Sequence, residues 1–211
     1  MKQPVNLKGK LAAGATGLMV MSLSVAGVEL HTQLEGNKLT AYADPATKAD
    51  PWTICGGATG WITVDGKRIR VVKGLTLTAK QCEAVNHEIA EDARAILNTC
   101  VTRPLNQNQS NGLILFTINV GPAACTSTAI KRVNAGDFFG AAKALLAWSC
   151  APTKDPRYPF AHCGPRKRQM PGLLSRRKLE ASLLNTPVLP FQRSLMGNIA
   201  AANAKLLEDA Q

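Results

Sequence analysis

Two carboxylates and a hydroxyl lie close together in the stretch QLEGNKLTAYADPATKADPWTICGG, residues 33–57. Glu35 stands directly before Gly36, a residue type that commonly ends helices, and Asp44 follows nine positions later in a polar turn. The negative end of a helix dipole favours the protonated form of Glu35, whereas Asp44 is expected to stay ionised. Hydrolysis of a glycosidic bond requires one carboxyl of each kind, and the hydroxyl of Thr53 in the strand-like PWTIC is suited to orient the attacking water.

Each of these residues also has an ordinary structural explanation when it is taken alone. Glu35 is then the acid of an ion pair, Asp44 the first residue of a turn, and Thr53 a plain strand residue. Asp50 is followed by proline, as Asp44 is, so Asp50 is the alternative second carboxylate. The chemical interpretation therefore depends on finding the three groups together in one site.

An uncharged apolar run at residues 11–28 precedes Glu35, and lysines stand before it at positions 2, 8 and 10. A run of this length is barely sufficient to span a bilayer, and the lysines favour an orientation with the body of the protein outside the cytoplasm. Three interpretations stay open. The run is a weak anchor that leaves the membrane uncleaved, a signal peptide cleaved after residues 24–26, or a buried Ala/Gly-rich core helix.

The segment after Glu35 predicts a small sheet and then a long helix. Strand-forming residues alternate with Gly, Asp and Pro over about 37–76, and the Asp-Gly pair in TVDGKRIRV indicates a hairpin. Thr78 and Gln81 have the spacing of a capping box, and apolar residues then recur at three- and four-residue steps. This pattern predicts a linking helix over about 78–100, while residues 28–35 are expected to continue the apolar run as helix.

The remainder is expected to be mostly helical. Helices are predicted at 106–120, 126–133, 137–148 and 173–184, with a proline-rich loop over 151–172. An extension at 186–211 is expected to hold a further helix over roughly 191–210. The fold class is thus α+β and mostly helical: a small sheet lobe and a larger helical lobe (about 101–185), joined by the long helix.

Charge and cysteine content narrow the class of partner and the compartment. With 25 Lys+Arg against 14 Asp+Glu the 211-residue chain carries +11, which indicates an anionic partner such as nucleic acid, a membrane surface or an acidic wall polymer. No helix-turn-helix or zinc-finger signature is evident, so nucleic acid is not expected. The cysteines form no C-x-x-C pair or zinc-spaced cluster, and an even number suits an oxidising compartment. They stand at positions 55, 82, 100, 125, 150 and 163.

Together these segments resemble phage-type lysozymes, glycoside hydrolase family 24, and the apolar run resembles that of signal-anchor-release endolysins. The matching segments are LEGNKLTAYAD, WTICGGATG, FTINVG, STAIKRVNAGDFFGAA and GLLSRRKLEASLL, in family order from about residue 29 to 184. The resemblance implies a two-lobed lysozyme domain at 29–185 with a cleft between its lobes. It implies hydrolysis, with inversion, of the β-1,4 bond between N-acetylmuramic acid and N-acetylglucosamine, which lyses the host.

Residue roles follow from the same resemblance. Glu35 would be the acid, Asp44 and Thr53 would position the water, and no cofactor or metal would be needed. The chain departs from the family in having eight residues between Asp44 and Thr53 where five are usual. It also has Ala58 where many relatives carry a histidine, which puts a role for that histidine in doubt.

The resemblance and proximity in the chain favour the disulfides 55–82, 100–125 and 150–163. Cys82 and Cys100 lie about 27 Å apart along one helix and cannot bond to each other. The basic cluster at 165–178 is either a binding site for acidic wall peptides or lipopolysaccharide phosphates, or a solvated helix face that caps the lobe.

The implied partners are wall glycan strands and, through residues 11–28, the host inner membrane before release of a monomer into the periplasm. Two other activities compete with hydrolysis. One is a lytic transglycosylase, which needs no aspartate-bound water, and the other is cationic membrane disruption on a lysozyme scaffold.

Overall fold

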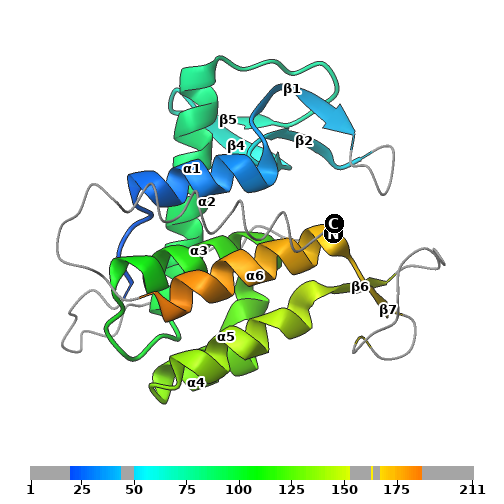
Figure 1. Cartoon of the computed structure of the whole chain (residues 1–211). Coiled ribbons are helices and arrows are strands. Elements are labelled where there is room, and N and C mark those ends of the chain that lie inside the picture. The colour runs from blue at the N-terminus through cyan, green and yellow to red at the C-terminus, as the bar shows by residue number, and fades with distance from the viewer. Residues whose placement is uncertain (1–19, 44–49, 153–162, 164–166, 187–211) are drawn as a thin grey trace.

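The computed structural model describes residues 20–43, 50–152, 163 and 167–186, and these form a sheet lobe and a helical lobe (Figure 1). The long helix α2 (Ala79–Asn98) runs from the sheet lobe to the helical lobe. A mostly helical α+β fold with two lobes was predicted, and it is confirmed. Asp44, residues 11–19 and the expected helix at 191–210 lie outside the described residues.

The sheet lobe contains one three-stranded antiparallel sheet and one hairpin. The sheet has the order β1 (Lys38–Ala43), β2 (Trp52–Cys55), β3 (Ala58–Thr59), with β2 in the centre. The predicted hairpin is formed by β4 (Trp61–Val64) and β5 (Lys67–Arg70). Its two turn residues, Asp65 and Gly66, have positive φ of 50° and 76°, as a tight turn matched to the twist of two strands requires.

Helix α2 begins where its sequence predicts. The Thr78 side chain accepts from the backbone N–H of Gln81, and the Gln81 side chain accepts from the backbone N–H of Thr78. These reciprocal bonds satisfy two donors that a helix leaves open at its start. The apolar face of α2 is buried from Cys82 to Leu97, so it contributes to the core of both lobes.

The helical lobe surrounds α3 (Gln107–Val120), which is buried over most of its length. Its apolar centre, GLILF, is hydrophobic on all sides because neighbouring helices cover each face. The remaining elements are η1 (Gly121–Thr126), α4 (Thr128–Asn134), α5 (Phe138–Leu146), η2 (Ala147–Ser149) and α6 (Pro171–Asn185). Each predicted helix of this lobe is therefore present, with ends shifted by a few residues.

The prediction of an uninterrupted loop over 151–172 was wrong at both of its ends. There β6 (Cys150–Pro152) pairs antiparallel with β7 (Lys167–Gln169). Helices α5 and α6 pack together, so the chain that leaves η2 and the chain that enters α6 run side by side and their backbones bond. That pairing follows from tertiary packing, and the proline content of the segment gave no sign of it.

Helix α1 (Val25–Glu35) begins inside the apolar run, with Ser24 as its N-cap. The run was predicted to be helical before this point as well, but residues 20–24 are not helical. Val20 is fully buried in the core of the helical lobe. The backbone N–H groups of Met21 and Ser24 donate to Ser110 Oγ and Asn111 Oδ1, each at 3.1 Å. The second half of the run is thus bonded to α3 and belongs to the folded domain.

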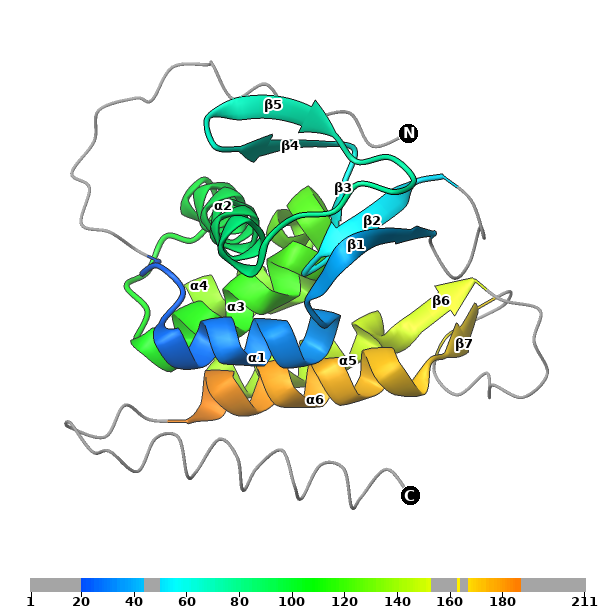
Figure 2. The ribbon, with the colours of Figure 1, turned by 90° about the horizontal axis from the view of Figure 1, so that it is seen from above.

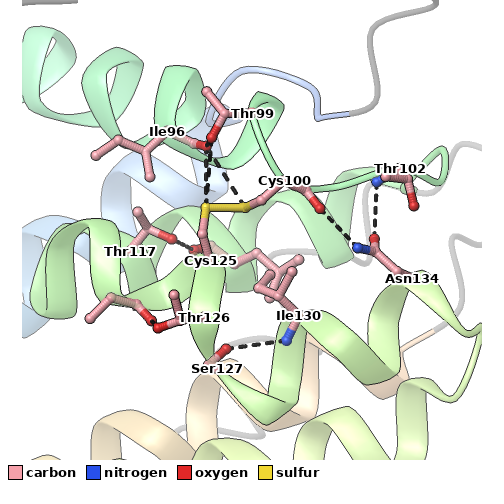
Figure 3. The surroundings of a disulfide bond; sticks show 12 residues. Ile96, Thr99, Cys100, Thr102, Thr117, Cys125, Thr126, Ser127, Ile130 and Asn134 are labelled. Carbon is pink, nitrogen blue, oxygen red and sulfur yellow. Dashed lines mark hydrogen bonds between the residues drawn. A yellow bond between two sulfur atoms is a disulfide. The ribbon is translucent and has the colours of Figure 1, made fainter.

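All three expected disulfides are present: Cys55–Cys82, Cys100–Cys125 and Cys150–Cys163. Cys100–Cys125 joins the end of α2 to η1 (Figure 3). Beside it, Asn134 of α4 accepts from Thr102 N–H at 2.9 Å and donates to Cys100 O at 2.8 Å. The segment between α2 and α3 is therefore held both covalently and by hydrogen bonds.

Among the described helices, no single one is both long enough and apolar enough to cross a membrane, and only a pair bent by 78°, Gln107–Thr126 with Thr128–Asn134, reaches that length and composition together.

Candidate active site

Glu35 is the last residue of α1, at the point where the sheet lobe begins. The N–H of Gly36 donates to Thr32 O at 2.8 Å and closes the final turn, so the helix ends where the sequence predicts. The Glu35 side chain is 20% exposed, so it is mostly covered but still in contact with solvent. Helix α1 itself packs on α3 and α6 through Leu30, beside Leu115, Leu179 and Leu183 (Figure 2).

Arg176 of α6 forms an ion pair with Oε1 of Glu35. Its second terminal nitrogen donates to Leu34 O at 3.4 Å, so the same guanidinium also bonds a carbonyl of the last turn of α1. A cation at the C-terminal end of a helix is favourable. Arg176 therefore contacts both the Glu35 carboxyl and the end of α1, whereas the sequence-based argument considered only the helix end.

The sheet lobe approaches Glu35 through the turn that follows β2. Gly57 has a φ of 96°, and a Cβ placed on it would lie 3.4 Å from Glu35 Oε2. The positive φ would strain any side chain at this position, and its Cβ would lie in van der Waals contact with the carboxyl. Thr53, four residues earlier, is buried in the central strand, in register with Tyr42 of β1 and Thr59 of β3. The central strand thus carries Thr53, and the turn after it brings Gly57 beside the Glu35 carboxyl.

Asp44, the predicted second carboxylate, follows Ala43, the last residue of β1, and lies outside the described residues. Ala43 pairs with Trp52, the neighbour of Thr53. The alternative, Asp50, is exposed and lies two residues before the start of β2. The catalytic roles of Glu35, Asp44 and Thr53 stay predictions.

The basic cluster at 165–178 does not form one surface patch, because two of its arginines point inward. Arg177 is fully buried and its Nη2 donates to Glu180 Oε1 at 2.8 Å and to Asn119 Oδ1 at 3.1 Å. Its guanidinium also lies 5.0 Å from the ring centre of Phe116. Burial raises the pKa of Glu180 and lowers that of Arg177, and their pairing limits both changes. Arg177 is thus part of the core, and Arg176 holds the carboxyl of Glu35.

Comparison with known proteins agrees with this geometry. The Phage lysozyme family model matches residues 32–180. The chain is 37% identical over 145 residues to the SAR-endolysin of Escherichia phage N15, covering 67% of this chain and 77% of that protein. It is 34% identical over 175 residues to the SAR-endolysin of Escherichia phage 933W, covering 82% and 87%.

Two solved structures share the fold. The endolysin from Escherichia coli O157:H7 phage FAHEc1 has a TM-score of 0.65 at 33% identity, covering 81% of this chain and 98% of that one. The muramidase domain of SpmX from Asticaccaulis excentricus has a TM-score of 0.63 at 29% identity, covering 78% of this chain and 98% of that one. The chain therefore belongs to the phage lysozyme family, and it is a peptidoglycan hydrolase of the glycosidase class.

Proposed function

We propose that the chain cleaves the β-1,4 bond between N-acetylmuramic acid and N-acetylglucosamine, with Glu35 as the general acid. The observation that carries this proposal is the position of Glu35: its side chain is partly exposed, and its carboxyl is held by Arg176 of the helical lobe and lies beside Gly57 of the sheet lobe. A glycan strand between the lobes would meet this carboxyl. The net charge of +11 attracts the acidic wall polymer.

In the proposed reaction, Glu35 gives its proton to the oxygen of the leaving sugar while a water attacks from the opposite face of the ring. Asp44 and Thr53 hold that water, which gives inversion; inverting carboxyl pairs are about 6.5–9.5 Å apart. When Glu35 loses its proton, its hydrogen bond with Arg176 becomes one between two charged groups and strengthens. Arg176 therefore stabilises the state that proton transfer produces and fixes the direction of the carboxyl.

A matched pair of variants tests which aspartate, Asp44 or Asp50, is the second carboxylate. Asp44→Asn is expected to lower kcat on purified sacculi by about 10²-fold or more, because the water loses its base. Asp50→Asn is expected to change kcat by less than about 3-fold, since surface polar changes away from a site have small effects. If instead Asp50→Asn is the inactive variant, the water is held by Asp50 and the assignment of Asp44 is wrong.

For the amino-terminal segment, we propose that residues 11–28 hold the newly made protein at the host inner membrane and then leave it uncleaved, releasing a periplasmic monomer. The relatives named SAR-endolysins support this interpretation. Glu35 stands seven residues after Val28, so a helix would place it only about 10 Å from the bilayer. A glycan strand could not enter a cleft held that close to lipid.

The packing of residues 20–28 supports a second way in which tethering would keep the protein inactive, which is the loss of contacts within the folded domain. Val20 is buried in the core, and Ser24 caps α1 and bonds to Asn111 of α3. Residues inserted in a bilayer cannot make these contacts, so the tethered protein lacks part of the packing that positions α1 and Glu35. Cleavage after Ala26 would remove Val20 and Ser24 permanently, which favours a segment that is retained. The catalytic domain then comprises 29–185 together with residues 20–28, followed by the extension at 186–211.

A more apolar segment is expected to delay lysis. Replacing Gly14 and Gly17 with leucine should keep the protein in the membrane fraction, because the helix then leaves the bilayer less readily. Both positions precede Val20, so the described core is unchanged. Lysis as rapid as that of the original chain would show that the tether is not a switch. The intact mass of the periplasmic form separates retention from cleavage, which would remove residues 1–26.

A further inference from the structure

His31 lies on α1 one turn before Glu35, and its side chain is buried with 2% of its surface exposed. Its Nε2 atom has no hydrogen-bond partner among the described residues. A buried polar nitrogen without a partner is costly and is rare in native proteins. The sequence gave no indication of this residue, since a single histidine on a helix has no distinctive pattern.

The imidazole lies against the turn that faces Glu35. A Cβ placed on Gly56 would lie 2.6 Å from His31 Nε2 and 2.7 Å from Asn86 Oδ1, so any side chain there would collide with both. Asn86 Oδ1 also accepts the backbone N–H of Gly56 at 2.8 Å. Gly56 is therefore fixed between α1 and α2, and the next residue, Gly57, lies beside Glu35.

Two side chains one turn apart on α1 thus lie beside two consecutive glycines of the sheet lobe: His31 beside Gly56, and Glu35 beside Gly57. The first contact sets the spacing at which the second is made. A displacement of the turn from His31 would move the sheet-lobe wall relative to the Glu35 carboxyl. In catalysis, small displacements of positioned groups have large effects on rate.

The surroundings of His31 favour the neutral ring. Burial lowers the pKa of His31, Glu35 on α1 acts to raise it, and Arg176 on α6 acts to lower it. From α2 the ring meets the uncharged amide of Asn86, and from the turn it meets backbone. Protonation would bring a second cation next to Arg176 in a site where burial disfavours charge.

We propose that His31 is a positioning residue for the general acid: its neutral imidazole holds α1 against the Gly56–Gly57 turn, and protonation of the ring disturbs that contact and lowers kcat at acidic pH. The proposal rests on the proposed role of Glu35. It assigns part of the acidic limb of the pH–rate profile to a residue that does not touch the substrate.

The linkage between protonation and stability has a definite sign. Because the folded-state pKa of His31 is lowered from 6.5, the unfolded chain binds more protons between those two values. His31 therefore contributes stability above pH 6.5, and this contribution is lost as the pH falls below 6.5 toward the folded-state pKa. The same change in pH should therefore reduce both kcat and the melting temperature.

The test compares the wild-type chain with His31→Gln and with His87→Gln, a matched control at an exposed histidine of α2. We expect kcat on soluble glycan strands to fall about tenfold per pH unit on the acidic limb for the wild type and His87→Gln. His31→Gln should lower kcat at pH 7.5, because the contact made by the imidazole is lost. Relative to its own value at pH 7.5, its kcat should be retained at least about fivefold better than that of the wild type at the same acidic pH, with KM unchanged. Superimposed profiles for all three proteins would overturn the proposal.

An NMR titration of the His31 ring in the wild-type chain provides a measurement that does not depend on the variant folding. The midpoint should lie below 6.5 and coincide with the acidic limb of kcat. A midpoint that does not coincide with the limb would refute the positioning role. Failure of the Glu35 assignment looks different: Glu35→Gln would then hydrolyse sacculi normally, while the titration of His31 and its effect on melting, both measured in the wild-type chain, would still be as expected.

Discussion

Glu35→Gln is expected to lower the rate of hydrolysis of purified sacculi by about 10²–10⁴-fold, because glutamine has the shape of the acid but no proton to give to the leaving oxygen. The amide oxygen of glutamine can still accept from Arg176, so the end of α1 should stay in place. Turbidity loss of sacculi and the melting temperature should be measured on the same preparation.

The matched control for this variant is Glu29→Gln, an exposed acid on the same helix, which should retain full activity. If Glu35→Gln hydrolyses sacculi at the wild-type rate, Glu35 is not the acid. If the variant is inactive on sacculi but still kills whole permeabilised cells, the protein also acts on membranes, as the competing hypothesis of cationic disruption requires.

Removal of the buried acid of α6 should have the largest effect on stability. Glu180→Ala is expected to lower the free energy of unfolding by about 3–5 kcal/mol, because it leaves Arg177 charged and buried without its partner. Both side chains are 0% exposed, so water cannot replace the lost contact without opening the core. Urea unfolding followed by circular dichroism measures the change.

Two controls separate the buried ion pair from the loss of a side chain. Glu91→Ala breaks an ion pair of the same i,i+3 type with Arg94 on α2, where the partners are 24% and 29% exposed, and should cost only about 0–1 kcal/mol. The double replacement Arg177→Met and Glu180→Leu should recover most of the loss, since no buried charge remains. Equal effects of Glu180→Ala and Glu91→Ala would mean that the pair in α6 does not contribute as described.

Local patterns were sufficient to predict most of the fold. The capping box at Thr78 and Gln81, the Asp65–Gly66 turn and the apolar periodicity of α2 each involve residues a few positions apart, and each is present in the structure. The disulfide pairs came from the resemblance to a family and from proximity. The start of α1 at Val25 was missed because Ser24 is a single polar residue within an apolar run that continues on both sides of it.

The groups around Glu35 could not be predicted in this way. Arg176 is 141 residues away in the sequence, and in a basic cluster it looks like any exposed cation. Arg177 and Glu180 have the spacing of an ordinary surface pair, and only the packing of α6 on α3 buries them. His31 becomes informative only when Gly56 is seen beside it. In each case the decisive partner comes from another element of the fold.

The most direct test is the chemistry of the new chain ends. Sacculi digested in water enriched with ¹⁸O should yield reducing N-acetylmuramic acid ends that carry one heavy oxygen, detected by mass spectrometry, and Glu35→Gln digests should yield none. Ends in the 1,6-anhydro form without solvent oxygen would show that no water attacks the bond, and they would contradict hydrolysis at this site.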